Sequence, residues 1–363
     1  MTKKRVIGRI VLLALLVYVL WAAWLIVRFE RYESPSVSPA GRALTEIEGV
    51  YHVHSKNSDG FGTVDRIARA AARTGLDFII LTDHGKPNFA ALNAQGKKNG
   101  VLVLAGSEIS SNRGHLIALG FDRPEDSFRF SSDAEIAARE ISERGGFSII
   151  AHPYSKVRWS WGEGFDYSGL EIIDADSVVK ARVVRSLPYY PLILVKPTLA
   201  FLKMIVPPAR ALGKWDQLLG RAPANGYYSA DAHLLYRAIF PVFHLHVLLE
   251  QPLAAEFTAA SRQIFAALAG GRFFSAVDRA AAARGFRSSL DGGSLRVSAP
   301  FSFAHEIVIV HDGRVIQRTR ENELVLPLPA PGAYRAEVYL RERTPLDAGT
   351  PWIISNPVYY RNE

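Results

Sequence analysis

The stretch Val50-Tyr51-His52-Val53-His54 places two histidines two residues apart at the end of an apolar segment with strand character. Successive side chains of a strand point to opposite faces, so both imidazoles project from one face and can share an ion. Similar pieces end later apolar segments, namely Thr82-Asp83-His84, Gly106-Ser107-Glu108, Gly114-His115, Ala151-His152-Pro153 and Asp231-Ala232-His233, and Asp59 follows the first segment. Nine oxygen and nitrogen donors arranged in this way predict a site for several metal ions and indicate metal-assisted hydrolysis.

The chain around these pieces alternates between strand-like and helix-like segments. We expect strands over 50–54, 78–81, 101–105, 115–119, 147–151 and 170–173. Helices are expected over 63–73, from the capping-box spacing Ser132-Asp133-Ala134-Glu135 to residue 144, and over 254–269. Such alternation predicts an α/β fold with a parallel sheet, either open or closed into a barrel. In both arrangements sites form beyond the carboxyl ends of the strands, where the histidines and carboxylates lie.

Composition restricts the chemistry. The 363 residues carry a formal net charge of +8, and the four residues Lys3, Lys4, Arg5 and Arg9 supply half of it. Basic residues do not form a stripe interleaved with aromatic residues, so we expect no nucleic-acid partner. The chain has no cysteine, so any metal must be bound by His, Asp and Glu.

The N-terminal segment predicts a membrane anchor. Residues 10–27 form an uninterrupted apolar run that can span a bilayer core of about 30 Å. Basic residues crowd the N-terminal flank, which places the N-terminus in the cytoplasm and the remainder in the periplasm or outside the cell. A cleaved signal peptide is the alternative, but Ile26-Val27-Arg28-Phe29 lacks the small residues of a cleavage site. We expect a single-pass protein of the inner or cell membrane.

Five regions follow from this pattern. They are an anchor over 1–33, a linker over 34–48, a metal-binding α/β domain over 49–287, an insertion within it over about 186–219, and a small antiparallel β domain over 288–363. The insertion is apolar but contains several prolines, so it either packs on the domain or dips into the membrane surface. We interpret His244 and His246 as structural, and we assign no role to His305 or His311.

The ordered pieces resemble the PHP (polymerase and histidinol phosphatase) family of metal-dependent phosphoesterases. The resemblance covers about 49–276 and fills all nine ligand positions of the family. It implies a distorted (β/α)7 barrel, here with an N-terminal transmembrane helix and the C-terminal β domain added. By resemblance, one ion would be held by His52, His54, Glu108 and Asp231, a second by Glu108, His115 and His152, and a third by Asp59, His84 and His233. Two or three Zn, Mn or Fe ions suit such ligands, and the sequence does not choose among them.

Three further residues are candidates for catalysis. Asp83 either orients a metal ligand or accepts hydrogen bonds from backbone amides at its strand end. Arg113 either pairs with a substrate phosphate or is a solvated charge. Glu171 belongs to a strand whose end faces the same cavity, and it could touch the substrate.

The sequence therefore predicts a membrane-anchored phosphoesterase that hydrolyses a phosphate monoester or diester with metal-activated water. One alternative is a phosphatase of a lipid-linked phosphate, which the anchor and the apolar insertion favour. The other is a non-catalytic binding module that metal ions stabilise.

Overall fold

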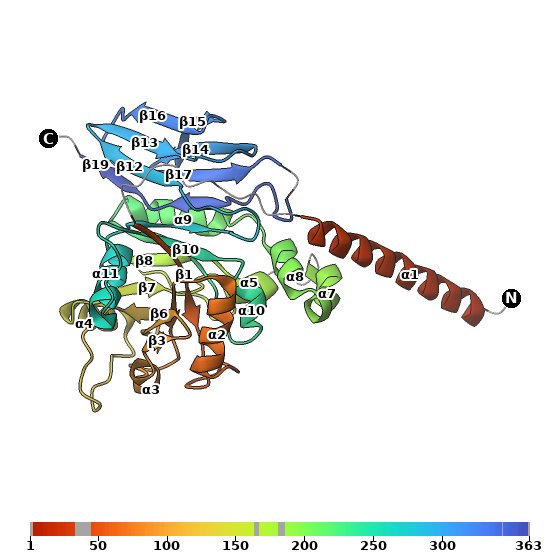
Figure 1. The fold of residues 1–363 in the computed structure, drawn as a ribbon, viewed down its shortest axis with the longest axis horizontal. Helices are drawn as coiled ribbons and strands as arrows, with labels where there is room; N and C mark the ends of the chain where they lie inside the picture. The colour runs from red at the N-terminus through yellow and green to blue at the C-terminus, as the bar shows by residue number, and fades with distance from the viewer. Residues whose placement is uncertain (1–2, 33–44, 163–166, 181–185, 343, 362–363) are drawn as a thin grey trace.

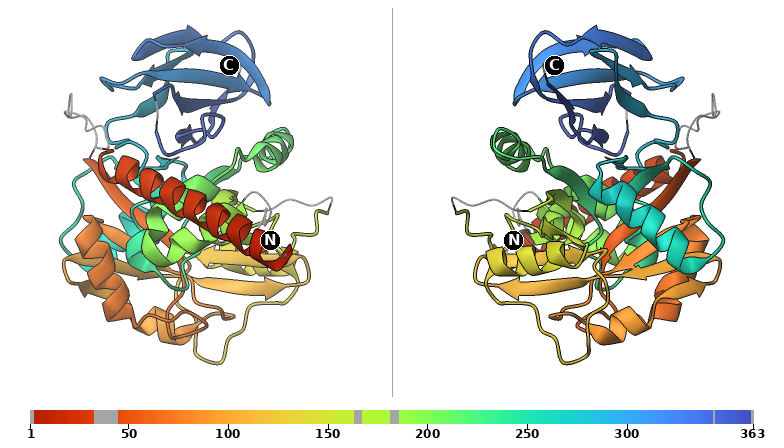
Figure 2. Two further views of the ribbon diagram at one scale, coloured as in Figure 1. Left: turned by 90° about the vertical axis from the view of Figure 1, so that its right-hand side faces the viewer. Right: turned by 90° about the vertical axis from the view of Figure 1, so that its left-hand side faces the viewer.

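The computed structural model describes residues 3–32, 45–162, 167–180, 186–342 and 344–361. Most of the expected linker over 34–48 lies outside these residues. The described part is a mixed α/β body with a β-rich C-terminal layer above it and one long helix, α1 (Lys3–Glu30), that extends away from both (Figures 1 and 2).

The strands form three sheets. The largest has the order β15 (Arg314–Thr319), β14 (His305–His311), β17 (Gly332–Leu340), β18 (Ile353–Ser355), β11 (Phe273–Ala276), β10 (His244–Leu249), β1 (Thr45–Val53), β2 (Phe78–Leu81), β4 (Val101–Ala105) and β3 (Gly96–Lys98), and β19 (Val358–Tyr360) pairs with β17. The second contains β5 (Ser107–Ser111), β6 (Gly114–Leu119), β7 (Phe147–Ile150), β8 (Gly169–Asp174) and β9 (Asn225–Ser229). The third contains β12 (Arg287–Asp291), β13 (Ser294–Ser298) and β16 (Glu323–Pro327).

The helices connect these strands. They are α2 (Val64–Thr74), α3 (Phe89–Asn93), α4 (Ala134–Glu143), α5 (Ala175–Lys180), the 3-10 turn η1 (Leu187–Tyr189), α7 (Tyr190–Val195), α8 (Pro197–Met204), α9 (Ala209–Leu219), α10 (Tyr236–Ile239) and α11 (Phe257–Ala269). The sequence signals at their ends act locally. Thr63 caps α2 by accepting from Arg66 N, and Gly75 ends it in the left-handed conformation. Asp133, rather than Ser132, caps α4.

The sheets are mixed, so the expected parallel arrangement is correct only in part. β1, β2 and β4 run parallel, as do β7, β8 and β9. β6 is antiparallel to both β5 and β7, and β10 is antiparallel to β1 and β11. Only Asn112 and Arg113 separate β5 from β6, and a connection this short permits antiparallel pairing alone.

Backbone hydrogen bonds join the first two sheets at two places. The chain after β9 bonds to the end of β1, where Ala232 N donates to His52 O at 3.1 Å and His54 N donates to Ala232 O at 3.0 Å. Beyond β2, Gly85 N donates to Glu108 O at 3.0 Å, and His84 and Glu108 form a parallel bridge. An apolar core that draws side chains from both sheets, such as Tyr51, Ile80 and Ile149, lies below these junctions.

The β-rich C-terminal region continues the largest sheet. β18 pairs with β11, and β17 pairs with β18 and β14. A tight turn at Asp312-Gly313 joins β14 to β15, and these two residues have φ of 45° and 78°. Such positive values suit a two-residue hairpin loop. The C-terminal strands are therefore hydrogen-bonded to the α/β body through β18.

Among the described residues, α1 is the one helix long and apolar enough to cross a membrane, a property that a signal sequence shares. Its C-terminal half contacts the insertion: Tyr18 Oη donates to Pro188 O at 3.0 Å, and the rings of Trp21 and Tyr189 lie 5.7 Å apart. Within the insertion, α8 is largely buried and α9 buries one face, whereas Leu194 and Val195 of α7 are 89% and 69% exposed.

An ion network ties β1 to β10 and to the chain that leads into the C-terminal strands. His246 is fully buried, with Nδ1 2.8 Å from Glu46 Oε1 and Nε2 2.7 Å from Asp278 Oδ2. His244 lies beside it, with Nε2 donating to Phe240 O at 2.8 Å and Nδ1 3.2 Å from Glu48 Oε2.

Four members of this network, Glu48, His244, His246 and Asp278, offer atoms within the reach of a single ion. The network is balanced without one, because Arg284 pairs with Glu48 and Arg287 with Glu46, both at 2.6 Å, and a protonated His246 balances Asp278. Burial would lower the pKa of His246, but Asp278, Glu46 and Glu48 raise it to about 10. The geometry therefore supports a structural role for both histidines.

This network predicts a pH-dependent loss of stability in the variant His246→Gln. Because the folded pKa of about 10 lies above the ordinary 6.5, the stabilisation is complete below pH 6.5 and is lost as the pH rises through 10. Leaving buried carboxylates without their partner should cost about 3–5 kcal/mol at pH 6 and clearly less at pH 10. Chemical denaturation at both pH values measures this, with His311→Gln as the control. A pH-independent difference would contradict the charged state of His246.

Candidate metal centre

The nine residues that the sequence singled out lie at strand ends and in one loop, but Glu108 and His115 lie near the starts of β5 and β6 rather than at the expected carboxyl ends. His52 and His54 end β1, His84 follows β2, Glu108 lies on β5, His115 on β6, His152 follows β7, Asp231 and His233 follow β9, and Asp59 comes from the loop after β1. All nine converge at the junction of the two sheets. Their neighbours in the chain are buried strands, so the backbone that holds them is rigid.

The backbone is strained at three of these residues. His52, His152 and Asp231 have φ of 62°, 25° and 35°, a region that residues other than glycine rarely occupy. The pairing of β1 with β2 also shifts register between Tyr51 and Val53, around His52. Each such conformation costs about 1–3 kcal/mol, and its persistence here is typical of a functional site.

Glu108 lies at the centre of the cluster and is 1% exposed. Its Oε1 is 2.7 Å from His115 Nδ1 and 2.9 Å from His152 Nε2. Its Oε2 is 3.3, 3.1 and 3.5 Å from nitrogens of His52, His54 and His84. The two oxygens of one carboxylate thus face two different groups of imidazoles, which is the arrangement of a carboxylate that bridges two ions.

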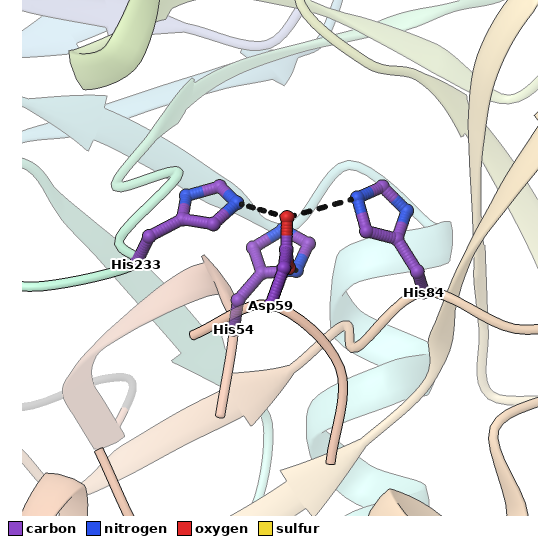
Figure 3. A group of neighbouring side chains, drawn as sticks. All are labelled: His54, Asp59, His84 and His233. Atoms are coloured by element: carbon purple, nitrogen blue, oxygen red, sulfur yellow. Dashed lines mark ion pairs between the residues drawn. The ribbon is translucent and has the colours of Figure 1, made fainter. Parts of the chain in front are cut away.

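Asp59 organises a second group on the open side of the cluster. Its Oδ1 is 3.2 Å from His54 Nδ1, and its Oδ2 is 3.2 Å from His233 Nε2 and 3.6 Å from His84 Nε2. Figure 3 shows His84 and His233 approaching the Asp59 carboxylate from opposite sides, with His54 beneath it.

The donors divide into a buried and an open half. The side chains of His52 and His54 are fully buried, whereas those of Asp59, His84 and His233 are 52%, 32% and 26% exposed. Asp231 belongs to the buried half, with Oδ1 3.4 Å from His52 Nε2 and 3.6 Å from His233 Nδ1. A ligand from solvent therefore reaches the Asp59 side first.

The carboxylates dominate the electrostatics of the cluster. Burial would lower the pKa of His54 and His152, but contacts with Asp59 and Glu108 raise that of His54, and Glu108 raises that of His152, each to about 9. Burial would likewise raise the pKa of Glu108, but His52, His115 and His152 hold it well below its ordinary value. The cluster therefore has a strong affinity for positive charge.

The donor set fits divalent metal ions. Two buried nitrogens, His54 Nε2 and His84 Nδ1, have no hydrogen-bond partner, although both lie within 3.5 Å of Glu108 Oε2. Unpartnered buried polar atoms are rare and require an explanation. Imidazole and carboxylate donors without thiolate are suitable for Zn²⁺, Mn²⁺ and Fe²⁺.

Glu171 is a positioning residue in this geometry. Its carboxylate is fully buried, with Oε1 accepting from Tyr51 Oη and His52 Nδ1 at 2.6 Å each and Oε2 accepting from His152 N at 2.6 Å. Both oxygens accept hydrogen bonds within the protein and the side chain is fully buried, so it is not exposed to a substrate. It fixes the His52 ring with Nε2 directed at Glu108 and Asp231, as carboxylates behind metal-binding histidines do.

Asp83 also acts through its neighbours. It is fully buried and accepts from Ser55 N at 2.7 Å, Ser55 Oγ at 2.9 Å and Ser58 Oγ at 2.7 Å. These bonds shape the loop that carries Asp59. Both sequence interpretations are thus combined, because Asp83 accepts a backbone N–H and thereby places a candidate ligand.

Arg113 lies at the edge of the cluster. Its guanidinium pairs with Glu135 and donates to Ser160 O at 3.2 Å, and it is only 24% exposed. The β5–β6 hairpin holds it there, next to His115. A role in binding phosphate remains a prediction, since it would require exchange of these partners.

Sequence reasoning missed two groups near the ligands. Tyr236 Oη lies 2.9 Å from His54 O and 2.6 Å from His233 O, and it accepts from Gly62 N at 3.0 Å. It thereby joins three segments that carry ligands, but nothing in its local sequence marks it. Asp174, at the end of β8, is buried beside Asp231 and Glu171, and burial and these carboxylates raise its pKa to about 7. Its strand-end position was the available signal.

Comparison with known proteins gives the following matches. Residues 51–174 match the family model described as the PHP domain, a range that includes seven of the nine donors but not Asp231 or His233. An uncharacterized protein of Methanocaldococcus jannaschii is 27% identical over 159 residues, which are 38% of this chain and 91% of that protein.

Two solved structures are also similar. A two-domain protein of Bacteroides vulgatus, described as containing a predicted PHP-like metal-dependent phosphoesterase, aligns with 90% of this chain and 99% of its own, at 16% identity and a TM-score of 0.47. An amidohydrolase of Chromobacterium violaceum aligns with 51% of this chain and 87% of its own, at 15% identity and a TM-score of 0.33.

The role of Glu171 can be tested with the variant Glu171→Gln. An amide keeps the shape but weakens the hold on His52 Nδ1, so affinity for the metal at the buried half should fall by about 10–100-fold. Metal content by mass spectrometry after equilibration with graded Mn²⁺ measures this. The matched control is Glu135→Gln, which removes the exposed partner of Arg113. Equal metal retention in both variants would assign Glu171 a role in packing alone.

Proposed function

We propose that this chain, which contains a PHP domain over residues 51–174, is a membrane-anchored, metal-dependent hydrolase of phosphoric esters. The observation that carries the proposal is the position of Glu108, whose two carboxylate oxygens face separate groups of imidazoles. Structural zinc sites need only four protein ligands, whereas nine donors converge here. A donor set of this size suits catalysis better than it suits structural support.

Two or three Zn, Mn or Fe ions per chain would be held by the nine donors. His52, His54, Glu108 and Asp231 would hold one, Glu108, His115 and His152 a second, and Asp59, His84 and His233 a third. The geometry supports this assignment of ligands to three ions. His54 is the exception, because its Nδ1 also faces Asp59, which is assigned to the third ion. When bound, the ions supply an activated water at neutral pH and neutralise charge on the phosphate oxygens.

The residues around the donors hold the metal ligands in position and leave the site open to a substrate. Glu171 and Asp83 hold His52 and the Asp59 loop in position through buried hydrogen bonds. The exposed faces of Asp59, His84 and His233 leave the site open for an ester that approaches from solvent. A phosphate monoester or diester is the substrate class that this open, multi-donor site best accommodates, and no nucleic-acid partner is proposed.

We also propose that one distorted seven-stranded barrel is formed by β1, β2, β4, β6, β7, β8 and β9, with β5 counted as the continuation of β4 beyond Gly106. The bond from Ala232 N to His52 O and the His84–Glu108 bridge support closure at both junctions of the two sheets. In this arrangement the nine donors lie at the mouth of the barrel.

For the cellular location, we propose that α1 spans the inner or cell membrane with the metal centre on the periplasmic or external side. The charges Lys3, Lys4, Arg5 and Arg9 at its N-terminal end support this orientation. A lipid-linked phosphate is the second candidate substrate. It is favoured by the insertion, because Pro188 and Tyr189 of η1 contact α1 and the following helix α7 exposes Leu194 and Val195.

Replacing a buried donor should abolish hydrolysis. His52→Ala and Asp231→Ala each remove a donor that faces Glu108 or its neighbours, so turnover of an aryl phosphate monoester or diester should fall at least about 100-fold. The assay uses the full chain in detergent with added Mn²⁺ or Zn²⁺. His311→Ala is the control, since His311 lies in the C-terminal β region. Wild-type rates in either site variant would exclude this site as the catalytic centre.

Chelation should separate catalysis from structural stabilisation. Treatment with a chelator should eliminate turnover while the circular dichroism spectrum stays unchanged, because the cores of the sheets pack without the site. Adding Mn²⁺ or Zn²⁺ back should restore turnover. Loss of folded structure on chelation, with no turnover at any metal loading, would instead support the metal-stabilised binding module.

A further inference from the structure

A cavity of about 380 Å³ lies where α1 meets the rest of the molecule. Its walls come from the last turns of α1, from α8 and from the chain at Thr344 and Pro345. The lining combines apolar side chains, among them Leu25, Phe29 and Leu199, with the three cationic side chains Arg28, Arg31 and Lys203. A site that is both apolar and cationic suits an amphipathic anion.

Three cationic side chains lie together at this cavity. Among the described residues, no carboxylate oxygen lies within 4.0 Å of the charged nitrogens of Arg28, Arg31 or Lys203. The neighbouring acid Glu30 is engaged by Lys196. Burial and the charge of Arg28 lower the pKa of Lys203, while Asp347 counteracts them. An anion bound between these side chains would relieve their mutual repulsion.

The position of the cavity along α1 indicates where that anion comes from. Residues 10–27 carry no charge, and 18 helical residues span about 27 Å, close to the thickness of a bilayer core. With α1 across the membrane, Arg28 and the cavity lie at the level of the lipid headgroups. Trp21 and Trp24 lie one to two turns below, where interfacial tryptophans are common.

The apolar surface next to the cavity continues into the bilayer. Pro188 and Tyr189 contact Tyr18 and Trp21, which lie about 18 and 14 Å along α1 from Glu30. Leu194 of α7, 89% exposed, follows this contact closely in the chain and adds to the exposed apolar surface of the insertion. The surface that leads away from the cavity thus offers lipid tails an apolar path beside α1.

We propose that this cavity binds the phosphate headgroup of an anionic phospholipid from the bilayer. Arg28, Arg31 and Lys203 hold the phosphate, and the acyl chains lie along α1 and α7. The proposal rests on the membrane span proposed above but not on catalysis. A lipid bound between α1, α8 and Thr344 would hold the protein in one orientation. The metal centre would then keep a fixed position relative to the membrane plane.

The test is lipid binding by the full chain in detergent, titrated with phosphatidylglycerol or phosphatidylcholine and followed by native mass spectrometry. We expect phosphatidylglycerol to bind at least about fivefold more tightly than phosphatidylcholine. Lys203→Gln and Arg28→Gln should each weaken phosphatidylglycerol binding about fivefold and leave phosphatidylcholine binding unchanged. Two variants on different helices guard against a folding defect in one, which thermal unfolding would reveal.

Lys4→Gln is the matched control, since it removes a basic residue from the opposite end of α1. An equal loss in Lys4→Gln would show general attraction to basic flanks and would overturn the proposal. So would equal affinity for both lipids, or displacement of phosphatidylglycerol by inorganic phosphate, which would identify a site for free phosphate. The measurement needs neither an ester nor a bound metal, so its failure is distinguishable from failure of the hydrolase proposal.

Discussion

The structure depends on one buried charge. The Glu108 carboxylate lies within 3.5 Å of five imidazoles and is almost inaccessible to water. An isolated carboxylate in such a place would cost far more than a domain can supply, so positive charge must accompany it. The surrounding histidines provide that charge as protons, and divalent ions can displace those protons. Because His52, His115 and His152 come from different strands, the same charge also holds the two sheets together at their junctions.

The strain in the backbone has a clear origin in this arrangement. Regular strands would project His52 and His54 in parallel, but the left-handed conformation of His52 and the register shift beside it change how its ring is presented. Glu171 then secures that ring from behind. Strain of this kind persists only where surrounding packing determines the conformation. Backbone hydrogen bonds on both sides of His52 provide that determination, from Ala230 N to Tyr51 O, from Ala232 N to His52 O and from His54 N to Ala232 O.

Short-range signals in the sequence predict much of this site, and long-range contacts account for what they miss. The recurrence of His, Asp and Glu after apolar segments identifies the nine donors, since strand ends on one edge must meet. The same reasoning cannot find the antiparallel direction of β6 without recognising that Asn112 and Arg113 form a two-residue connection. It assigns Glu171 to substrate contact, whereas Tyr51 and His152 N, distant in sequence, occupy its oxygens. Tyr236 is missed for the same reason, because two of its partners, His54 O and Gly62 N, are distant in sequence.

The insertion lies in the sequence between two strands that carry residues of the donor cluster. It follows β8, which bears Glu171 and Asp174, and it precedes β9, which leads to Asp231 and His233. Within it, Pro188 and Tyr189 contact α1, and Leu199 and Lys203 of α8 line the cavity beside that helix. Because β8 and β9 are adjacent and parallel, Glu171 and Asp231 both lie within reach of His52. The excursion of the chain to α1 therefore leaves the two strands paired and the residues around His52 together.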